Sequence, residues 1–402
     1  MKILLLTDVP PCKEFSGALL TYHLCKTIPL ENVVCVAVRN KDLSYINTAD
    51  DLSIETEYFA KPRENTLWLF NGKIKIFTYL FEQYNEFFQI PKLARQIIDF
   101  GRQQNIDRIW CILQGQTMIR LAKLVAHGLK LPLLSQVWDH PIWWMGHNQI
   151  DAFTSRRIYK QYEDVLSMSA SCGAASFEMA RRIMENNHVV SIPLVSSLPS
   201  EWAHKPKIFP PQNKKNILIG FCGQTYADYA IDAIMSSLDV IGWKIGNRQV
   251  KFRFLGYHIS LGGHRKRIVE FLGYRSQQET IDLLSECDLL LCPYITDPKY
   301  KLVAQTSFPA KLTTYLASGV PILFIGTPDS SPGLFLAENN AGYLQTDLNS
   351  EKLVECLQGI FSNKKHYESI SNNASIAFHK YLTMEKQAEL FLDFLHYGDH
   401  VL

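Results

Sequence analysis

A lysine near the start of a short predicted helix is the residue in this chain best suited to bind an anion. Its segment, Gln305–Leu323, reads QTSFPAKLTTYLASGVPIL and predicts a loop, a helix over Lys311–Ala317 and a buried strand. Ser307 suits the N-cap of that helix and Gly319 its end. The N–H groups at a helix N-terminus favour an anion by only about 0.3–1 kcal/mol per charge. We therefore expect Lys311 to supply the cation that a diphosphate needs; the alternative is a solvated lysine on an ordinary helix.

A second group of candidates follows a predicted strand that ends at Val137. Asp139 and His140 could orient a hydroxyl group and accept its proton, which contributes about 10²–10⁴-fold to a rate. The alternatives are a turn or helix-cap carboxylate for Asp139 and a packed or solvated imidazole for His140. The chain contains no Asp-x-Asp sequence, so we expect no metal site and a reaction that is independent of metal.

Two runs of alternating strands and helices must position these residues. A Ser-, Pro- and Lys-rich linker at 196–214 separates the two runs. Strand-like apolar segments precede it at 2–7, 33–38, 108–113, 131–137 and 169–175, and follow it at 217–222, 250–255, 271–273, 288–293 and 320–324. Such alternation is typical of α/β proteins with parallel sheets. We therefore predict two Rossmann-like domains, 1–205 and 206–375, and a C-terminal helix at 376–402. The ligand would lie in a cleft across which the domains face each other, beyond the carboxyl ends of the strands.

Composition and charge narrow the class of protein. The chain has 402 residues, a formal net charge of +2, nine cysteines without a CxxC pair and no apolar run of about 20 residues. These features argue against a nucleic-acid partner and against a membrane span. With an N-terminus unlike a signal peptide, they predict a cytoplasmic protein with reduced thiols. The aromatic and lysine-rich segment 54–90 has two interpretations: part of the core, or a surface in peripheral contact with the inner face of a membrane or with a lipid-linked substrate.

The second half of the chain resembles a known group of enzymes. FLGYRSQQETIDLLSECDLLLCPY, from Phe271, and SFPAKLTTYLASGVPIL, from Ser307, are similar to the donor-binding half of GT-B glycosyltransferases, in particular the large retaining group of family 4 type. The resemblance covers 216–345 well and 1–200 loosely. It implies a hexosyltransferase-type enzyme of polysaccharide biosynthesis that moves a sugar from a UDP or GDP donor to a glycan or lipid-linked acceptor. Retention, and no cofactor beyond this nucleotide-diphosphate sugar, are also implied.

The resemblance implies roles for individual residues in the donor half. Gly273 and Tyr274 would lie against the nucleobase, and Gly223 and Gln224 would approach the diphosphate. Lys311 would face the phosphates and stabilise the leaving group. The other donor-binding candidates are Arg275 and, in the segment around Lys311, Ser307, Leu312 and Thr314. The last helix of the family usually crosses back onto the N-terminal domain, which 376–395 could do.

The N-terminal half would hold the acceptor. Ser16 and Gly17 could let a sugar approach the main chain, although a simple helix start is the alternative. Trp138, Trp143 and Trp144 crowd the loop that carries the catalytic candidates Asp139 and His140. Tryptophan faces stack on sugars, but they also fill cores and lie at membrane interfaces.

The sequence departs from the family at several positions. Thr306 and Thr314 stand where many members have two glutamates, the second of which contacts the donor ribose; a hydroxyl lacks the charge assistance of that bond. GQTYADYAID, from Gly223, lacks the Arg and Lys that often bind phosphate, so Arg275 or a basic residue of 264–267 would have to help Lys311. Two alternative functions therefore stay open: a nucleotide-sugar epimerase of the same fold, and a non-catalytic glycan-binding relative.

Overall fold

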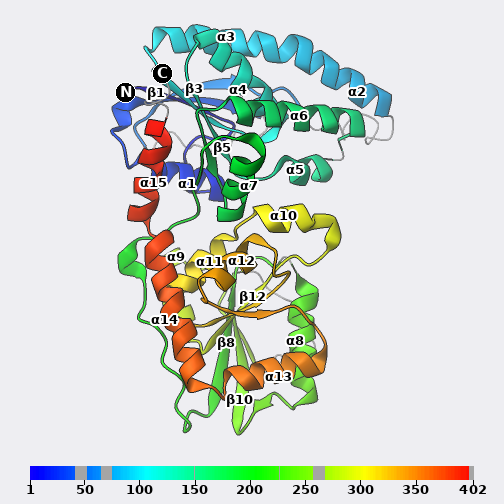
Figure 1. The fold of residues 1–402 in the computed structure, drawn as a ribbon, viewed down its shortest axis with the longest axis vertical. Helices are drawn as coiled ribbons and strands as arrows, with labels where there is room; N and C mark the ends of the chain where they lie inside the picture. Colours follow the sequence, from blue (N-terminus) through cyan, green and yellow to red (C-terminus); the bar gives the residue numbers. More distant parts are fainter. Residues whose placement is uncertain (41–51, 65–74, 149, 226, 257–267, 398–402) are drawn as a thin grey trace. The chain divides into compact units, whose positions relative to one another are not determined.

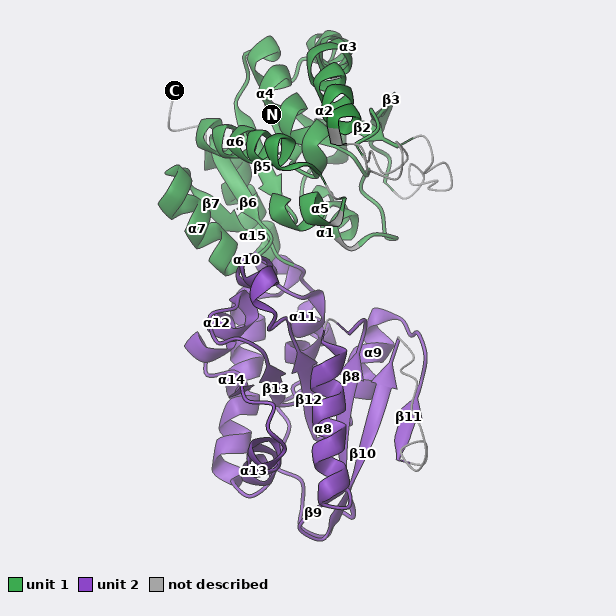
Figure 2. Cartoon of the chain, turned by 90° about the vertical axis from the view of Figure 1, so that its right-hand side faces the viewer, with its two compact units in different colours: residues 1–195, 387–402 green, residues 196–386 purple. Residues whose placement is uncertain are grey.

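The chain divides into two compact units. The computed structural model describes residues 1–40, 52–64, 75–148, 150–225, 227–256 and 268–397. Unit 1 is Met1–Val195 with Gln387–Leu402, and unit 2 is Ser196–Lys386 (Figures 1 and 2). The segment 196–214, predicted as a linker, therefore belongs to unit 2.

Unit 1 is built on a parallel sheet with the order β3-β2-β1-β4-β5-β6-β7. Its strands are β1 (Ile3–Thr7), β2 (Val33–Arg39), β3 (Glu55–Ala60), β4 (Arg108–Ile112), β5 (Leu133–Val137), β6 (Ser171–Ala174) and β7 (Ser191–Pro193). Every residue of β1, β4 and β5 is buried, as is typical of the central strands of a parallel sheet that is covered on both faces. The order reverses between β1 and β4, as in a Rossmann fold.

Helices cover both faces of this sheet (Figure 1). They are α1 (Ser16–Cys25), α2 (Lys75–Tyr84), α3 (Ile90–Gln103), α4 (Gly115–Leu129), α5 (Pro141–His147), α6 (Ala152–Met168) and α7 (Phe177–Asn187), with a π-helical turn η3 (Asn85–Gln89) between α2 and α3 and a 3-10 turn η1 (Leu30–Asn32). Leu4, Leu6 and Ile109 face the core that α3, α4 and α6 complete. Ile3, Leu5 and Trp110 face the core on the α1 side.

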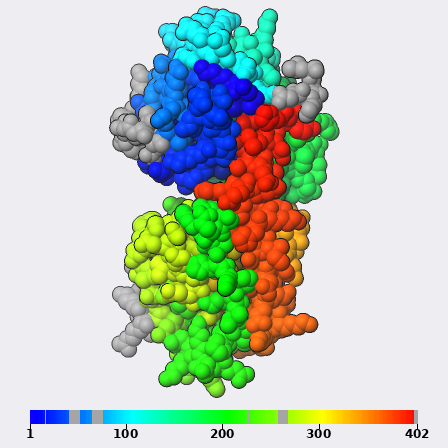
Figure 3. Space-filling model, turned by 90° about the vertical axis from the view of Figure 1, so that its left-hand side faces the viewer, coloured from blue at the N-terminus to red at the C-terminus, as the bar shows by residue number. Residues whose placement is uncertain are grey.

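The C-terminal helix α15 (Met384–His396) closes the second of these cores. Its Phe391 ring lies 4.7 Å from the ring of Trp110. Arg108 Nη1 donates a 2.6 Å hydrogen bond to the Leu395 carbonyl, and Ser171 Oγ donates one of 2.8 Å to the Phe394 carbonyl. Figure 3 shows this red helix against the blue N-terminal part of unit 1.

Unit 2 repeats the architecture with the sheet order β11-β10-β8-β12-β13-β14, in which the order reverses between β8 and β12. Its strands are β8 (Asn216–Cys222), β9 (Lys244–Ile245), β10 (Arg248–Leu255), β11 (Val269–Phe271), β12 (Leu289–Pro293), β13 (Ile322–Ile325) and β14 (Tyr343–Gln345). All of the pairs are parallel except β9 with β10. Its helices are η4 (Ser200–Trp202), α8 (Asp228–Val240), α9 (Gln277–Ser285), η6 (Pro298–Tyr300), α10 (Lys301–Thr306), α11 (Ala310–Ala317), α12 (Ser331–Glu338), α13 (Ser350–Ile360) and α14 (Lys364–Tyr381).

The prediction of an α/β protein with two Rossmann-like domains is confirmed. Each of the nine cysteines lies in the described part of the chain and has a free thiol. Within the same described part, none of the helices has the length and apolar character required to cross a membrane.

Candidate functional site

The loops that leave β8 and β10 form a tight glycine-lined turn in unit 2. Gly223 follows β8 with φ +78°, and Gly256 follows β10 with φ +89°, values that favour glycine. Gly223 N donates a 3.0 Å hydrogen bond to Leu255 O, and Gly256 N donates one of 2.8 Å to Gly273 O. A Cβ atom on Gly256 would lie 3.4 Å from Gly223 N. The structure thus brings the predicted donor residues Gly223 and Gly273 together through Gly256, which the sequence analysis missed.

The helix that carries Lys311 begins one residue before the predicted start, and its N-cap differs from the predicted one. Helix α11 starts at Ala310 with Pro309 as its N-cap, so the prediction of Ser307 as N-cap was wrong. Ser307 instead ends α10, where its N–H donates a 2.9 Å hydrogen bond to Val303 O and its carbonyl accepts one of 3.1 Å from the Tyr294 hydroxyl. The physical reason is the proline: the residue before it is disfavoured in helical conformation, which prevents α11 from including Phe308.

Lys311 reaches from the first turn of α11 to the loop after β8. Its ammonium group donates a hydrogen bond to the main-chain oxygen of Gln224 and lies 4.6 Å from the ring centroid of Phe221. A Cβ atom on Gly223 would lie 3.8 Å from Lys311 Cε. Burial lowers the pKa of Lys311. A cation is therefore held at the carboxyl end of β8, beside the point where the sheet order reverses, which is where open α/β sheets bind their ligands.

Tyr315 fixes α11 against this edge of the sheet. Its buried hydroxyl accepts a 2.9 Å hydrogen bond from Cys222 N and donates one of 3.1 Å to Leu291 O, so it joins the helix to β8 and β12. Leu312 is fully buried and Thr314 is 5% exposed, so α11 presents mainly Lys311 and its N-terminal main chain. Thr306, the other threonine at a family glutamate position, is 2% exposed and donates a 2.7 Å hydrogen bond to Leu302 O of its own helix.

The remaining donor candidates lie on the loop between β11 and α9. Tyr274 is 78% exposed, and its ring atom Cε1 would lie 3.9 Å from a Cβ atom on Gly256. Arg275 is exposed, and its Nη1 donates a 2.8 Å hydrogen bond to Tyr274 O. The exposed Tyr274 ring is thus adjacent to the glycine turn. The basic residues 264–267 lie outside the described residues.

Polar side chains also gather in unit 1 at the carboxyl ends of β1, β3 and β4. Lys61 Nζ lies 3.5 Å from Asp8 Oδ2 and 2.9 Å from Glu64 Oε2, and Thr117 N donates a 2.7 Å hydrogen bond to Glu64 Oε1. Burial raises the pKa of Asp8, and the nearby Lys61 opposes that rise. The sequence analysis missed this cluster. One signal for it was present: Asp8 directly follows the first predicted strand.

Asp139 and His140 follow β5 at the same sheet edge. Burial raises the pKa of Asp139, and a hydrogen bond from Gln114 opposes that rise. Burial, with a smaller effect of Arg182, lowers the pKa of His140 to about 4. His140 Nδ1 accepts a 3.4 Å hydrogen bond from Ile142 N and caps α5. His140 is therefore a neutral helix cap at neutral pH, packed 5.9 Å from the ring of Tyr162.

The predicted acceptor residues fall into two places. Gly17, next to Ser16 at the start of α1, is covered by Trp138: a Cβ atom on Gly17 would lie 2.5 Å from the Trp138 ring. On α5, Trp143 is 40% exposed, whereas Trp144 is buried. Trp143 is thus the tryptophan of this group with the most accessible ring.

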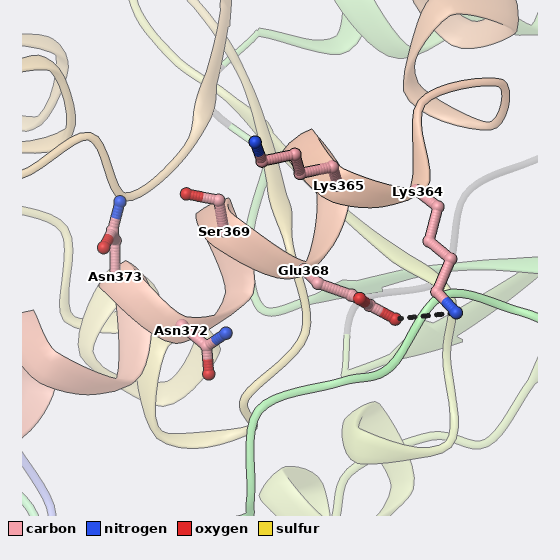
Figure 4. Close-up of a pocket in the computed structure, with 6 residues that line it drawn as sticks. All are labelled: Lys364, Lys365, Glu368, Ser369, Asn372 and Asn373. Atoms are coloured by element: carbon pink, nitrogen blue, oxygen red, sulfur yellow. Dashed lines mark ion pairs between the residues drawn. The ribbon is translucent and has the colours of Figure 1, made fainter.

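Other features of the chain do not add to these sites. Across the described ranges, no group of three or more His, Cys, Asp and Glu side chains is placed to hold a metal ion. A pocket on α14 is lined by residues of that helix alone, from Lys364 to Asn373. Figure 4 shows Lys364 directed toward Glu368, with 4.0 Å between the charged atoms. None of the candidate residues of either sheet edge lines this pocket.

Comparisons with known proteins extend these observations. The sequence matched no protein-family model and none of the curated proteins. Solved structures did match. HepE of Anabaena, crystallised with UDP, gives a TM-score of 0.66 at 13% identity over 98% of this chain and 99% of that chain. Another HepE crystal structure contains UDP-glucose.

Two further solved structures show the same likeness. Sucrose-phosphate synthase from Thermosynechococcus elongatus gives a TM-score of 0.64 at 11% identity over 100% of both chains. The lipopolysaccharide outer core galactosyltransferase WaaB gives 0.62 at 11% identity over 98% of this chain and 99% of that chain. These structural neighbours are GT-B glycosyltransferases. This chain has two Rossmann-like units, each built on a sheet of mainly parallel strands, and so has the GT-B fold.

Proposed function

We propose that this protein is a glycosyltransferase that moves a sugar from a nucleotide-diphosphate donor to a glycan or lipid-linked acceptor. The observation that carries the proposal is the position of Lys311, hydrogen-bonded to Gln224 O beside the glycine turn of unit 2. A Cβ atom on Gly223 would lie 3.8 Å from Lys311 Cε and 3.9 Å from Lys311 Nζ, so this glycine lies directly beside the cation. The fold supports the same class of activity, and the UDP and UDP-glucose in the HepE crystals favour a UDP donor.

The chemistry follows from the charge that develops on the leaving group. When the bond between the anomeric carbon and the diphosphate oxygen breaks, Lys311 and the first N–H groups of α11 would stabilise the negative charge. Because Lys311 is already held at the loop and partly desolvated, little reorganisation is needed at the moment of reaction. We propose that this transfer is metal-independent and proceeds with retention.

The acceptor would bind unit 1 at the carboxyl edge of its sheet. Asp139 is the candidate there to orient the acceptor hydroxyl and receive its proton, because burial raises the pKa of this carboxyl toward the range of a useful base. The departing phosphate is the other group that can take the proton. His140 is the weaker candidate, since its Nδ1 accepts the hydrogen bond that caps α5.

The proposal is tested by binding and turnover of nucleotide sugars. Calorimetry with UDP and GDP should detect one of them, and the matching nucleotide sugar should then be converted in the presence of glycan or lipid-linked acceptors. Chelator should not reduce this turnover. The proposal would be contradicted if neither UDP nor GDP bound. Epimerisation of the donor in the absence of an acceptor would favour the epimerase alternative instead.

A second candidate is a protein that binds a nucleotide sugar or glycan without transferring it. The buried Thr306 and Thr314 favour it, because no carboxylate stands at these two positions where family members have glutamates. Nucleotide binding without turnover on any acceptor is the result that would select this candidate.

A further inference from the structure

Helix α2 and the π-helical turn η3 expose apolar side chains to solvent and bury polar ones, the reverse of an ordinary surface helix. Their exposed side chains are apolar, between 46% and 66% accessible, and we call these residues the α2 face: Ile76, Phe77, Leu80, Tyr84, Phe87 and Phe88. The side chains of the opposite face are buried and polar: Thr78, Glu82 and Asn85. A surface helix of a water-soluble protein normally buries its apolar stripe and exposes its polar one.

A network of polar contacts holds the helix in this orientation. Glu82 Oε2 lies 3.3 Å from Arg120 Nη1 of α4, and Glu82 Oε1 accepts a 3.0 Å hydrogen bond from Gln116. Asn85 Nδ2 donates a 2.9 Å hydrogen bond to Arg63 O. Rotation of the helix to hide its apolar side chains would leave these buried charged and polar groups without partners, at a cost of several kcal/mol. The α2 face is therefore a fixed part of the fold.

Within 76–96, the exposed residues that accompany the α2 face are cationic or uncharged. Among 76–96, the exposed residues beyond the α2 face are Lys92, Arg95 and Gln96, whereas Glu82 is buried and Glu86 pairs with Arg157 at 2.6 Å. Helix α6 lies beside α2, since Arg157 also lies over the Phe87 ring at 5.3 Å (Figure 2).

The first turns of α6 continue this character. Their exposed residues are Ala152, Phe153, Arg156 and Lys160, and Phe153 is 77% accessible. In these two stretches, 76–96 and 152–160, the structure places cations and aromatic rings at the surface and no exposed carboxylate. This is a local excess, because the net charge of the whole chain is only +2.

We propose that the α2 face docks onto a lipid bilayer that carries anionic headgroups. An interfacial helix buries aromatic and aliphatic side chains at the headgroup boundary, while flanking cations attract anionic lipid. Lys92, Arg95, Arg156 and Lys160 are placed to supply those charges. A second copy of the chain fits less well, because a self-complementary contact would offer these cations no exposed carboxylate from the same surface. This docking would bring unit 1, the proposed acceptor unit, to a lipid-linked acceptor, but it does not depend on sugar transfer.

The test is vesicle flotation of the full chain with phosphatidylcholine vesicles, with and without phosphatidylglycerol. Wild type should float with the anionic vesicles and much less with the neutral ones. The double variant Phe87→Ser/Phe88→Ser should lower the partition roughly tenfold or more, because apolar burial is lost. Arg156→Gln/Lys160→Gln should lower it about fivefold for each charge, and only with anionic vesicles.

Matched control variants separate binding through the α2 face from non-specific binding through other exposed apolar or cationic residues. Ile208→Ser/Val240→Ser changes two apolar residues of unit 2 that are 73% and 77% exposed, and Lys244→Gln/Lys251→Gln changes two exposed cations there. Both should float like wild type, and all of the variants should keep the wild-type melting temperature. Wild type that stays free of anionic vesicles, or phenylalanine variants that float normally, would overturn the proposal. The proposal would also be overturned if wild type formed a dimer that the phenylalanine variants disrupt and did not bind vesicles. Nucleotide binding, measured on the same samples, reports separately on the proposed function.

Discussion

The ammonium group of Lys311 and the main-chain oxygen of Gln224 are joined by a hydrogen bond that links the first turn of α11 to the glycine turn after β8. The two residues lie far apart in the sequence and come from different strand–loop–helix connections of unit 2. Their contact places a cation where two strands of a Rossmann-like sheet diverge. A diphosphate at that position would meet both the cation and the N-terminus of α11, which is the basis of the proposed donor site.

Gly223→Ala should weaken nucleotide binding and also destabilise the protein. A side chain at φ +78° costs about 1 kcal/mol, and its Cβ atom would lie 3.8 Å from Lys311 Cε, in the space assigned to the diphosphate. Calorimetry and thermal melting measure the two effects. The matched control is Gly246→Ala in the β9–β10 turn, with φ +58° and no atom within 4 Å of the added Cβ. It should lose similar stability and bind UDP normally; equal loss of binding in both variants would contradict this role of Gly223.

Tyr315→Phe should lower the free energy of unfolding by about 1–3 kcal/mol, because Cys222 N and Leu291 O lose a buried partner. It should also weaken UDP binding, since these bonds position α11 and therefore Lys311. Tyr367→Phe is the control: its hydroxyl donates a 2.6 Å hydrogen bond to Asp288 O, just before β12 begins. Denaturant unfolding should show comparable losses for both variants, with normal UDP affinity only in Tyr367→Phe. Normal affinity in Tyr315→Phe would show that Lys311 does not need this support.

His140 should make the stability of the protein fall in mild acid. Its pKa is about 4 in the folded protein, because of burial, and about 6.5 in an unfolded chain. The unfolded state therefore takes up the proton first, so the stability present above pH 6.5 is lost as the pH falls toward 4. His140→Asn keeps a residue suited to the N-cap of α5 and removes the titration. Urea unfolding between pH 7 and pH 4 should show a smaller loss for this variant than for wild type.

The control for this pH dependence is His188→Asn. His188 is exposed and has φ +55° at the C-cap of α7, a conformation that asparagine tolerates. The stability of the His188→Asn variant should keep the pH dependence of wild type. Parallel curves for wild type and His140→Asn would mean that His140 does not titrate in this way.

Buried strands were predictable from the sequence, but surface elements were not. The segments around β1, β2 and β8 were recognised because nearly all of their residues are buried and apolar. β3 is an edge strand whose residues are exposed or half-buried, so it has no such run. The sequence of α2 cannot show which face is buried: its apolar residues face solvent and its polar residues face inward, the reverse of the usual arrangement in a surface helix.

The candidate site was predictable only where one segment carries it. Lys311 and Gly223 could be proposed from local loop and helix signals. Gly256 and Tyr315 depend on contacts with distant segments, through Gly273 and Cys222, that no local pattern reveals. The Asp8–Lys61 pair likewise joins the ends of strands that are not consecutive in the sheet. His140 shows a different limit of local patterns: its position after β5 suggested a base, and the structure adds that its Nδ1 accepts the hydrogen bond that caps α5.

The most direct test of the central claim is the affinity of Lys311→Ala for UDP, measured by calorimetry beside wild type and the control Lys352→Ala, an exposed lysine of α13. Loss of a charge-assisted hydrogen bond to phosphate is worth about 1.5–3 kcal/mol, so the dissociation constant should rise roughly tenfold to a hundredfold. Lys352→Ala should bind like wild type. Unchanged affinity in a folded Lys311→Ala protein would contradict the assignment of this lysine to the diphosphate.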